Sequence, residues 1–155
     1  MVVEAGKPHN IAPAAPSWIE RIESGLLNYG IDMTLENNPL EMGLDRFVDL
    51  EQEAQFIGKE ALLRIQAAGI THKLVGLEMT GEKVTSFEDR WPITVEGEPS
   101  GYVTSATFSP RLEKNIAFAM VPIADTQLDT TMTVETPEGQ EEARVVPIPF
   151  IPPRA

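Results

Sequence analysis

The sequence predicts an α+β protein in which a helix-containing part, residues 1–69, precedes a small all-β part, residues 70–155. Two observations lead to this division. Before residue 70, apolar side chains recur at helical spacing in two segments, and both segments run up to a glycine. After residue 70, short β-rich runs alternate with Gly, Pro, Asn and Asp, which is typical of a small barrel or sandwich.

The composition is that of a globular and strongly acidic chain. Of the 155 residues, 42% are hydrophobic and 23% are charged, and the formal net charge is −12. Binding to nucleic acid or to anionic lipid relies on a basic surface, so this charge argues against both as partners. No apolar run is long enough to cross a membrane. A small anionic ligand would need a local basic site against this background.

The residue types also exclude several kinds of catalytic site. The chain has no cysteine, which excludes disulfides, cysteine nucleophiles and thiolate metal ligands. Its two histidines, His9 and His72, favour neither a metal site nor a hydrolase triad. The N-terminus lacks the basic and apolar parts of a signal peptide, and we therefore expect a cytoplasmic protein.

The chain is expected to begin with an extended segment and a short helix. Residues 1–16 contain three prolines and no periodicity, which predicts an extended lead-in. A helix is predicted over residues 17–30. Ser17 and Glu20 have the capping-box spacing at its start, and Gly30 provides the residue that ends it.

A loop, a strand and a second helix are expected next. Turn-forming residues dominate positions 34–43. The β-formers Phe47 and Val48 favour a strand over residues 43–50, although neither of its faces is cleanly apolar. A helix is predicted over residues 56–69 because one of its faces is apolar. That face consists of Ile57, Ala61, Leu62 and Ile65.

The all-β part is expected to end in an extended segment. The predicted strands are residues 72–79, 91–97, 101–108, 115–121, 131–136 and 143–148. The hydroxyl-rich stretch 104–110 lacks the glycines and the lysine of a phosphate-binding loop, so it is interpreted as a strand leading into a turn. The proline-rich residues 146–155 are interpreted as a tail laid over the barrel, with Phe150 and Ile151 available to attach it.

One carboxylate lies in an unexpected place on the first predicted helix. On a wheel of 100° per residue, Glu23 falls inside the apolar arc, between Ile19 and Leu27. A buried carboxylate without partners costs several kcal/mol. A cationic side chain, backbone N–H groups, or a ligand with two adjacent N–H donors would each satisfy it, and the helix alone does not decide among them.

Two aromatic residues flank this glutamate. The ring of Tyr29 is able to stack on a flat ligand while its hydroxyl makes a hydrogen bond, and Trp18 is able to form the wall of a planar pocket. Both residues have a structural alternative, in which Tyr29 packs at a helix terminus and Trp18 packs the entry of the chain.

Seven blocks between Pro16 and Ile151 resemble, in order and spacing, the C-terminal portion of the glycine cleavage T-protein (aminomethyltransferase) superfamily. They are RIESGLLNYGIDM, NPLEMGLDRFVDL, FIGKEALL, HKLVGLEM, YVTSATFSP, NIAFAMVP and PFIP. Within the superfamily the chain looks closest to the dimethylsulfoniopropionate demethylase branch. The resemblance implies that residues 1–69 are a helix-containing remnant of the folate-binding domain, and that residues 70–155 are the antiparallel β-barrel that follows it.

The resemblance implies a tetrahydrofolate-dependent one-carbon transferase that takes a methyl or aminomethyl group from a small-molecule donor. Glu23 matches the family's pterin-binding glutamate, which would accept the two parallel N–H donors of the pterin edge. Tyr29 matches the tyrosine of the family's YG block. Trp18 has no family counterpart, and its expected role in cofactor binding comes from its place on the helix.

The family's catalytic aspartate lies in an N-terminal part that precedes this region, so no catalytic residue is assigned here. Docking is therefore expected on that N-terminal part, on a partner chain, or on a second copy. The alternatives to a methyltransferase are an aminomethyltransferase fragment and a non-catalytic barrel module that docks on a partner chain.

Overall fold

The computed structural model describes residues 2–11 and 17–152. The helices are α1 (Val2–Gly6), α2 (Trp18–Glu23) and α3 (Lys59–Ala68), and the 3-10 turns are η1 (Lys7–His9), η2 (Asp45–Phe47) and η3 (Ile123–Asp125). The strands are β1 (His72–Met79), β2 (Pro92–Val95), β3 (Glu98–Ser109), β4 (Lys114–Pro122), β5 (Thr131–Thr136) and β6 (Gly139–Val146). Within the described ranges, no helix has both the length and the apolar character that crossing a bilayer requires.

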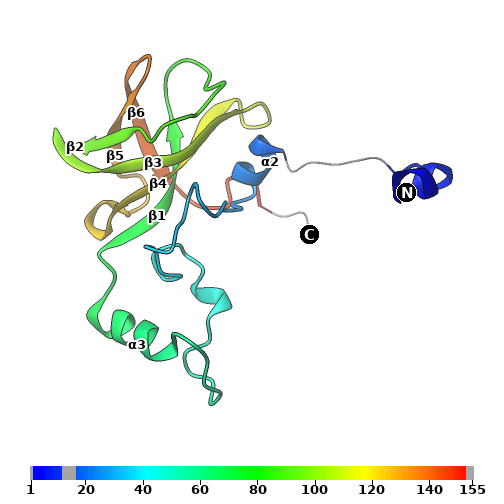
Figure 1. Ribbon diagram of the computed structural model, residues 1–155. Helices are drawn as coiled ribbons and strands as arrows, with labels where there is room; N and C mark the ends of the chain where they lie inside the picture. Colours follow the sequence, from blue (N-terminus) through cyan, green and yellow to red (C-terminus); the bar gives the residue numbers. More distant parts are fainter. Residues whose placement is uncertain (1, 12–16, 153–155) are drawn as a thin grey trace.

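The strands close into an antiparallel barrel, which confirms the predicted fold class and decides between barrel and sandwich (Figure 1). Neighbouring strands follow the order β1-β4-β3-β2-β5-β6, and β6 pairs back with β1. Closure leaves no open sheet edge. The strands β1 and β5 have the bounds predicted from the sequence, and β2, β3, β4 and β6 overlap their predicted segments.

Alternation along the strands produces two apolar clusters. Side chains that point into the barrel form its core, including Leu77 of β1 and Val121 of β4. Strand β4 is buried on both faces, and its outward side chains Ile116 and Phe118 belong to a second cluster with Ile22 of α2. The second cluster therefore joins the helical front part to the outside of the barrel.

The last described residues, 147–152, lie over the outside of the barrel and are called the C-terminal strap below. Phe150 stacks on Phe118 at a ring-centroid distance of 5.9 Å, and Ile148 packs against the same cluster. A Cβ added to Gly76 of β1 would lie 2.9 Å from Ile148 Cγ1, so the strap approaches the strand as closely as a glycine allows. For residues 147–152 this arrangement confirms the interpretation as a tail laid over the barrel, whereas Val146 belongs to β6 and residues 153–155 lie outside the described ranges.

The first predicted helix is shorter than expected. The side chain of Ser17 caps it as predicted, accepting a hydrogen bond from Glu20 N, but α2 ends at Glu23 rather than near residue 30. Gly25 has a φ of +73°, and Leu26 N donates to Arg21 O at 2.8 Å, the closure typical of a glycine-ended helix. Gly25 rather than Gly30 therefore ends the helix, and Tyr29 lies beyond it.

Two other expectations in the front part are wrong. The predicted strand over residues 43–50 is absent, and within this segment Asp45–Phe47 form η2, in which Phe47 N and Val48 N bond back to carbonyls three residues earlier. The described residues of the lead-in form α1 and η1 rather than an extended segment, and residues 12–16 lie outside the described ranges. The second predicted helix is confirmed as α3, which stands away from the barrel (Figure 1).

Candidate functional site

Two polar clusters attach the front part to strand β3. The inner cluster consists of Arg21, Asp32, Thr104 and Ser105, all of which are buried. Arg21 Nη1 lies 2.8 Å from Asp32 Oδ2, and Arg21 Nη2 donates to Ser105 Oγ at 2.7 Å. The hydroxyls of Thr104 and Ser105 donate to Asp32 Oδ1 at 2.9 and 2.5 Å.

Neighbouring groups cover the side chains of the inner cluster. The ring of Trp18 covers Arg21, whose guanidinium carbon lies 4.0 Å from the ring centroid. Asn28 N donates to Asp32 Oδ2 at 2.8 Å. Within the described part of the chain, Arg21 Nε has no hydrogen-bond partner. The cluster joins helix α2, the loop after it and the barrel, which is a structural role.

The outer cluster consists of Glu23, Ser109 and Arg111. Glu23 is 1% exposed. Ser109 Oγ donates to Glu23 Oε1 at 2.6 Å, Arg111 Nε donates to Oε2 at 2.9 Å, and Arg111 Nη2 lies 2.6 Å from Oε2. Of the three kinds of partner that satisfy a buried carboxylate, the structure therefore supplies the cationic side chain, assisted by a hydroxyl.

The outer cluster differs from the inner one because its cation reaches the surface. The side chain of Arg111 is 53% exposed, and Arg111 lines a cavity that Glu23 does not line. Ser109 Oγ also accepts a hydrogen bond from Leu112 N at 3.1 Å, which holds the turn between β3 and β4. Ser109 and Glu23 thus fix the position of an arginine that remains accessible.

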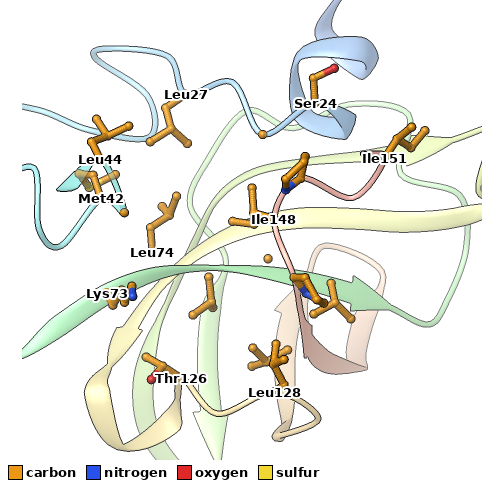
Figure 2. A pocket seen from close by; sticks show the side chains of 18 of the residues that line it. Ser24, Leu27, Met42, Leu44, Lys73, Leu74, Thr126, Leu128, Ile148 and Ile151 are labelled. Atoms are coloured by element: carbon orange, nitrogen blue, oxygen red, sulfur yellow. The ribbon is translucent and has the colours of Figure 1, made fainter. Parts of the chain in front are cut away.

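A cavity of about 680 Å³ lies between the C-terminal strap, the start of β1 and the loop that follows α2. Figure 2 shows Leu27, Met42, Leu44, Leu74 and Ile148 near one another, Lys73 on strand β1, and Thr126 and Leu128 beyond that strand. Arg46, Lys73 and Arg111 are its cationic lining residues. Among the described residues that line it there is no Asp or Glu, although the whole chain has 24 acidic residues.

Of the three residues that the sequence singled out for cofactor binding, two lie on the same helix and the third lies beyond its end. Trp18 and Glu23 both lie on α2 against β3, and Trp18 Nε1 donates to Ala106 O at 3.2 Å. Tyr29 is 61% exposed and forms an isolated bridge with Met33. Over residues 2–11 and 17–152, none of the three is among the residues that line the cavity. Their roles in cofactor binding stay predictions.

Sequence reasoning missed Asp32 and Arg111. The stretch 104–110 is a strand leading into a turn, as predicted, but its hydroxyls are the partners of two buried carboxylates. A signal was present in the sequence, since hydroxyls clustered on a buried strand need polar partners. The sequence did not indicate which carboxylates would reach them.

Metal binding and titration complete the description of polar groups. In the part of the chain that the structure describes, no group of three or more His, Asp or Glu side chains is placed to hold a metal ion. Burial raises the pKa of Glu78, but the hydrogen bonds and charges of Lys114 and Arg144 outweigh burial and hold that pKa below its ordinary value. Glu78 is not among the residues that line the cavity.

Comparison with known proteins agrees with the fold. Residues 72–151 match the family described as the glycine cleavage T-protein C-terminal barrel domain. An aminomethyltransferase from Symbiobacterium thermophilum is 40% identical over 151 residues, which are 96% of this chain and 40% of that protein. A dimethylsulfoniopropionate demethylase from Ruegeria pomeroyi is 39% identical over 141 residues, which are 91% of this chain and 38% of that protein.

A crystal structure of the glycine cleavage system aminomethyltransferase T from Bartonella henselae superposes with a TM-score of 0.76. Its sequence is 27% identical, and the match covers 84% of this chain and 37% of that one. The chain thus spans about 40% of the length of the curated relatives named above. With the barrel, the sequence blocks and the structural match in agreement, the chain belongs to the glycine cleavage T-protein family, of which it contains the C-terminal barrel.

Proposed function

We propose that the chain is the C-terminal part of a tetrahydrofolate-dependent one-carbon transferase. The observation that carries the proposal is the match of 96% of this chain to 40% of an aminomethyltransferase. The match of 91% of this chain to 38% of a dimethylsulfoniopropionate demethylase supports the same conclusion. The proposal also includes a domain boundary between residues 69 and 70, a folate cofactor and a cytoplasmic location.

The methyl branch is the first candidate for the reaction. The blocks RIESGLLNYG and NPLEMGLDRFVDL favour it, whereas identities of 39% and 40% do not separate the two branches. In the methyl branch, a sulfonium donor already carries a good leaving group, so the enzyme mainly aligns it with N5 of tetrahydrofolate. In the aminomethyl branch, the group leaves a lipoyl carrier and becomes methylene-tetrahydrofolate.

The rest of such an enzyme would cover the front part of this chain. Several large apolar side chains there are exposed: Leu26, Tyr29, Leu35, Phe47, Ile57 and Leu63. Exposed apolar surface of this kind marks an interaction site. We propose that an N-terminal part covers it, because about 60% of each relative's length lies outside the match. A separate partner chain and a second copy of this chain are the other occupants.

Reconstitution tests the proposal. The intact mass of the native protein establishes whether an N-terminal part is present, and where it is absent the corresponding part of the Ruegeria pomeroyi relative is co-expressed. We expect weak or no binding of tetrahydrofolate to the isolated chain, and binding with methyl transfer from dimethylsulfoniopropionate in the completed protein. Transfer from an aminomethyl-lipoyl carrier instead would select the alternative branch. A completed, folded protein that binds no folate would contradict the proposal.

The role of Glu23 in folate binding is a separate part of the test. For Glu23 to accept the pterin donors, Arg111 must first leave both of its contacts with Oε2. In that case Glu23→Gln lowers folate affinity at least tenfold in the completed protein, and Arg111→Gln does not lower it. Equal effects of the two variants would show that Glu23 acts only by holding Arg111. Glu20→Gln, an exposed glutamate on the same helix, is the control.

A further inference from the structure

The outer cluster holds Arg111 in one position at the edge of the cavity. We propose that Arg111, oriented by Glu23 and Ser109, binds the carboxylate or phosphate group of a small molecule whose apolar body lies in the cavity. Glu23 is then a positioning residue, and Arg111 is the residue that contacts the ligand. The inference goes beyond one-carbon transfer, since it requires neither folate nor any particular donor.

The hydrogen-bonding groups of Arg111 are only partly used. A guanidinium has five N–H donors. Contacts from Nε and Nη2 to Glu23 Oε2 use two of them, and the two on Nη1 and the second on Nη2 remain. Arginine presents such donors in a planar fork that matches a carboxylate or a phosphate. Because Glu23 and Ser109 already hold the side chain, less conformational entropy is lost when a ligand binds.

The lining of the cavity also suits an anionic group attached to an apolar body. Leucine, valine, isoleucine and proline side chains form most of the wall, and the described lining residues contribute three cations and no carboxylate. Within the described ranges, neither Arg46 nor Lys73 forms an ion pair. The lining of the cavity is therefore positively charged, whereas the whole chain has a net charge of −12. In so acidic a chain, a small anionic ligand requires a local basic site of this kind.

Among the three cations, the structure favours Arg111 as the contact residue. Arg46 is exposed and lies over the ring of Phe47 at 4.6 Å, without a buried partner to orient it. Lys73 lies near the start of β1, and within the described ranges no hydrogen bond or ion pair orients its ammonium group, whereas Glu23 holds the guanidinium of Arg111.

Binding of small probes to the intact chain tests the inference. The probes are 4-phenylbutyrate, its neutral amide, phenyl phosphate and inorganic phosphate, titrated by calorimetry and followed by NMR. We expect 4-phenylbutyrate or phenyl phosphate to bind at least tenfold more tightly than the amide. The comparison of these two identifies a carboxylate or a phosphate as the preferred group, and inorganic phosphate measures the anion alone.

Matched variants assign the binding to Arg111. We expect Arg111→Gln to weaken binding of the preferred probe at least tenfold and Arg111→Lys to weaken it severalfold. Lys114→Gln removes the same charge from a residue that does not line the cavity, and we expect less than a twofold change. Ser109→Ala keeps the arginine but removes one of Glu23's partners, and a two- to fivefold loss is expected. It also serves as the readout if Arg111→Gln does not fold.

Three outcomes would overturn the inference: no binding of any probe, equal binding of the neutral amide, or equal losses from Lys114→Gln and Arg111→Gln. None of them bears on one-carbon transfer, because no folate is present in these titrations. Conversely, a completed enzyme that fails to bind folate would leave a positive probe result in place.

Discussion

The inner and outer clusters use the same chemistry with different results. In each, a carboxylate of the front part accepts hydrogen bonds from a hydroxyl of β3 and from an arginine. In the inner cluster the arginine side chain is 9% exposed, whereas in the outer cluster it is 53% exposed. A buried acid therefore does not by itself mark a ligand site here, and the accessibility of its partner is the more useful indicator.

The position of each cluster along β3 explains the difference. Thr104 and Ser105 lie in the middle of the strand, where helix α2 and Trp18 cover them. Ser109 is the last residue of the strand, and Arg111 belongs to the turn that follows. A strand end faces both the packed helix and the adjacent cavity, so a side chain there is able to bond to one and remain open to the other.

The largest expected effect breaks the inner cluster. Asp32→Ala leaves Arg21 buried without its carboxylate, and we expect a loss of about 3–5 kcal/mol in the free energy of unfolding. Urea denaturation measures it. Asp129→Asn removes the charge of an exposed carboxylate that pairs with Arg144 and keeps a side chain that tolerates the φ of +67° there, so it should change stability by less than about 0.5 kcal/mol. Similar values for the two variants would mean that the inner cluster is not structural.

A smaller loss is expected when the outer cluster loses its cation. Arg111→Gln leaves Glu23 with Ser109 as its remaining side-chain partner, at a cost of about 1–3 kcal/mol. The cost stays below that of Asp32→Ala because the half-exposed site admits water to the carboxylate. The same urea experiment compares the two variants, with Lys114→Gln as the charge-matched control. A loss equal to that of Asp32→Ala would remove the distinction between the clusters.

Ser109→Ala tests how much the serine hydroxyl contributes to the outer cluster. It removes one hydrogen bond to Glu23 and one from Leu112 N, and we expect a loss of about 1–2 kcal/mol. Ser86→Ala, at an exposed position, is the control. If Ser109→Ala is as harmless as the control, the hydroxyl does not contribute to holding the carboxylate, and Arg111 alone satisfies it.

The smallest effect concerns an ion pair outside both clusters. The pKa of Glu78 is lowered in the folded chain, so its contribution to stability is present above its ordinary pKa of 4.5 and is lost as the pH falls through the folded value. We expect Glu78→Gln to cost about 0.2–1 kcal/mol at pH 7 and less at pH 2.5. Urea curves at both pH values measure this. A difference that does not shrink in acid would contradict it.

The strands were predictable because Gly, Pro, Asn and Asp separate short β-rich runs. Residues 72–79 and 131–136 have the bounds predicted from the sequence, since turn-forming residues flank both segments. The end of α2 was not found, although Gly25 was visible. Wheel geometry favoured continuing the helix to Gly30, and both glycines adopt positive φ. The prediction of a strand over residues 43–50 was wrong because the β-formers Phe47 and Val48 have no neighbouring strand to pair with.

The sequence by itself determined an all-β second part, the helix start at Ser17 and the membership of a family, because these depend on local periodicity and on ordered blocks of residues. It also showed that Glu23 needs a partner. Only the tertiary structure decided that the partner is Arg111, 88 residues away, and that this arginine stays open to a cavity. The physical reason is that a buried charge is satisfied by whichever group the closed barrel brings within hydrogen-bond distance, and sequence spacing does not encode that distance.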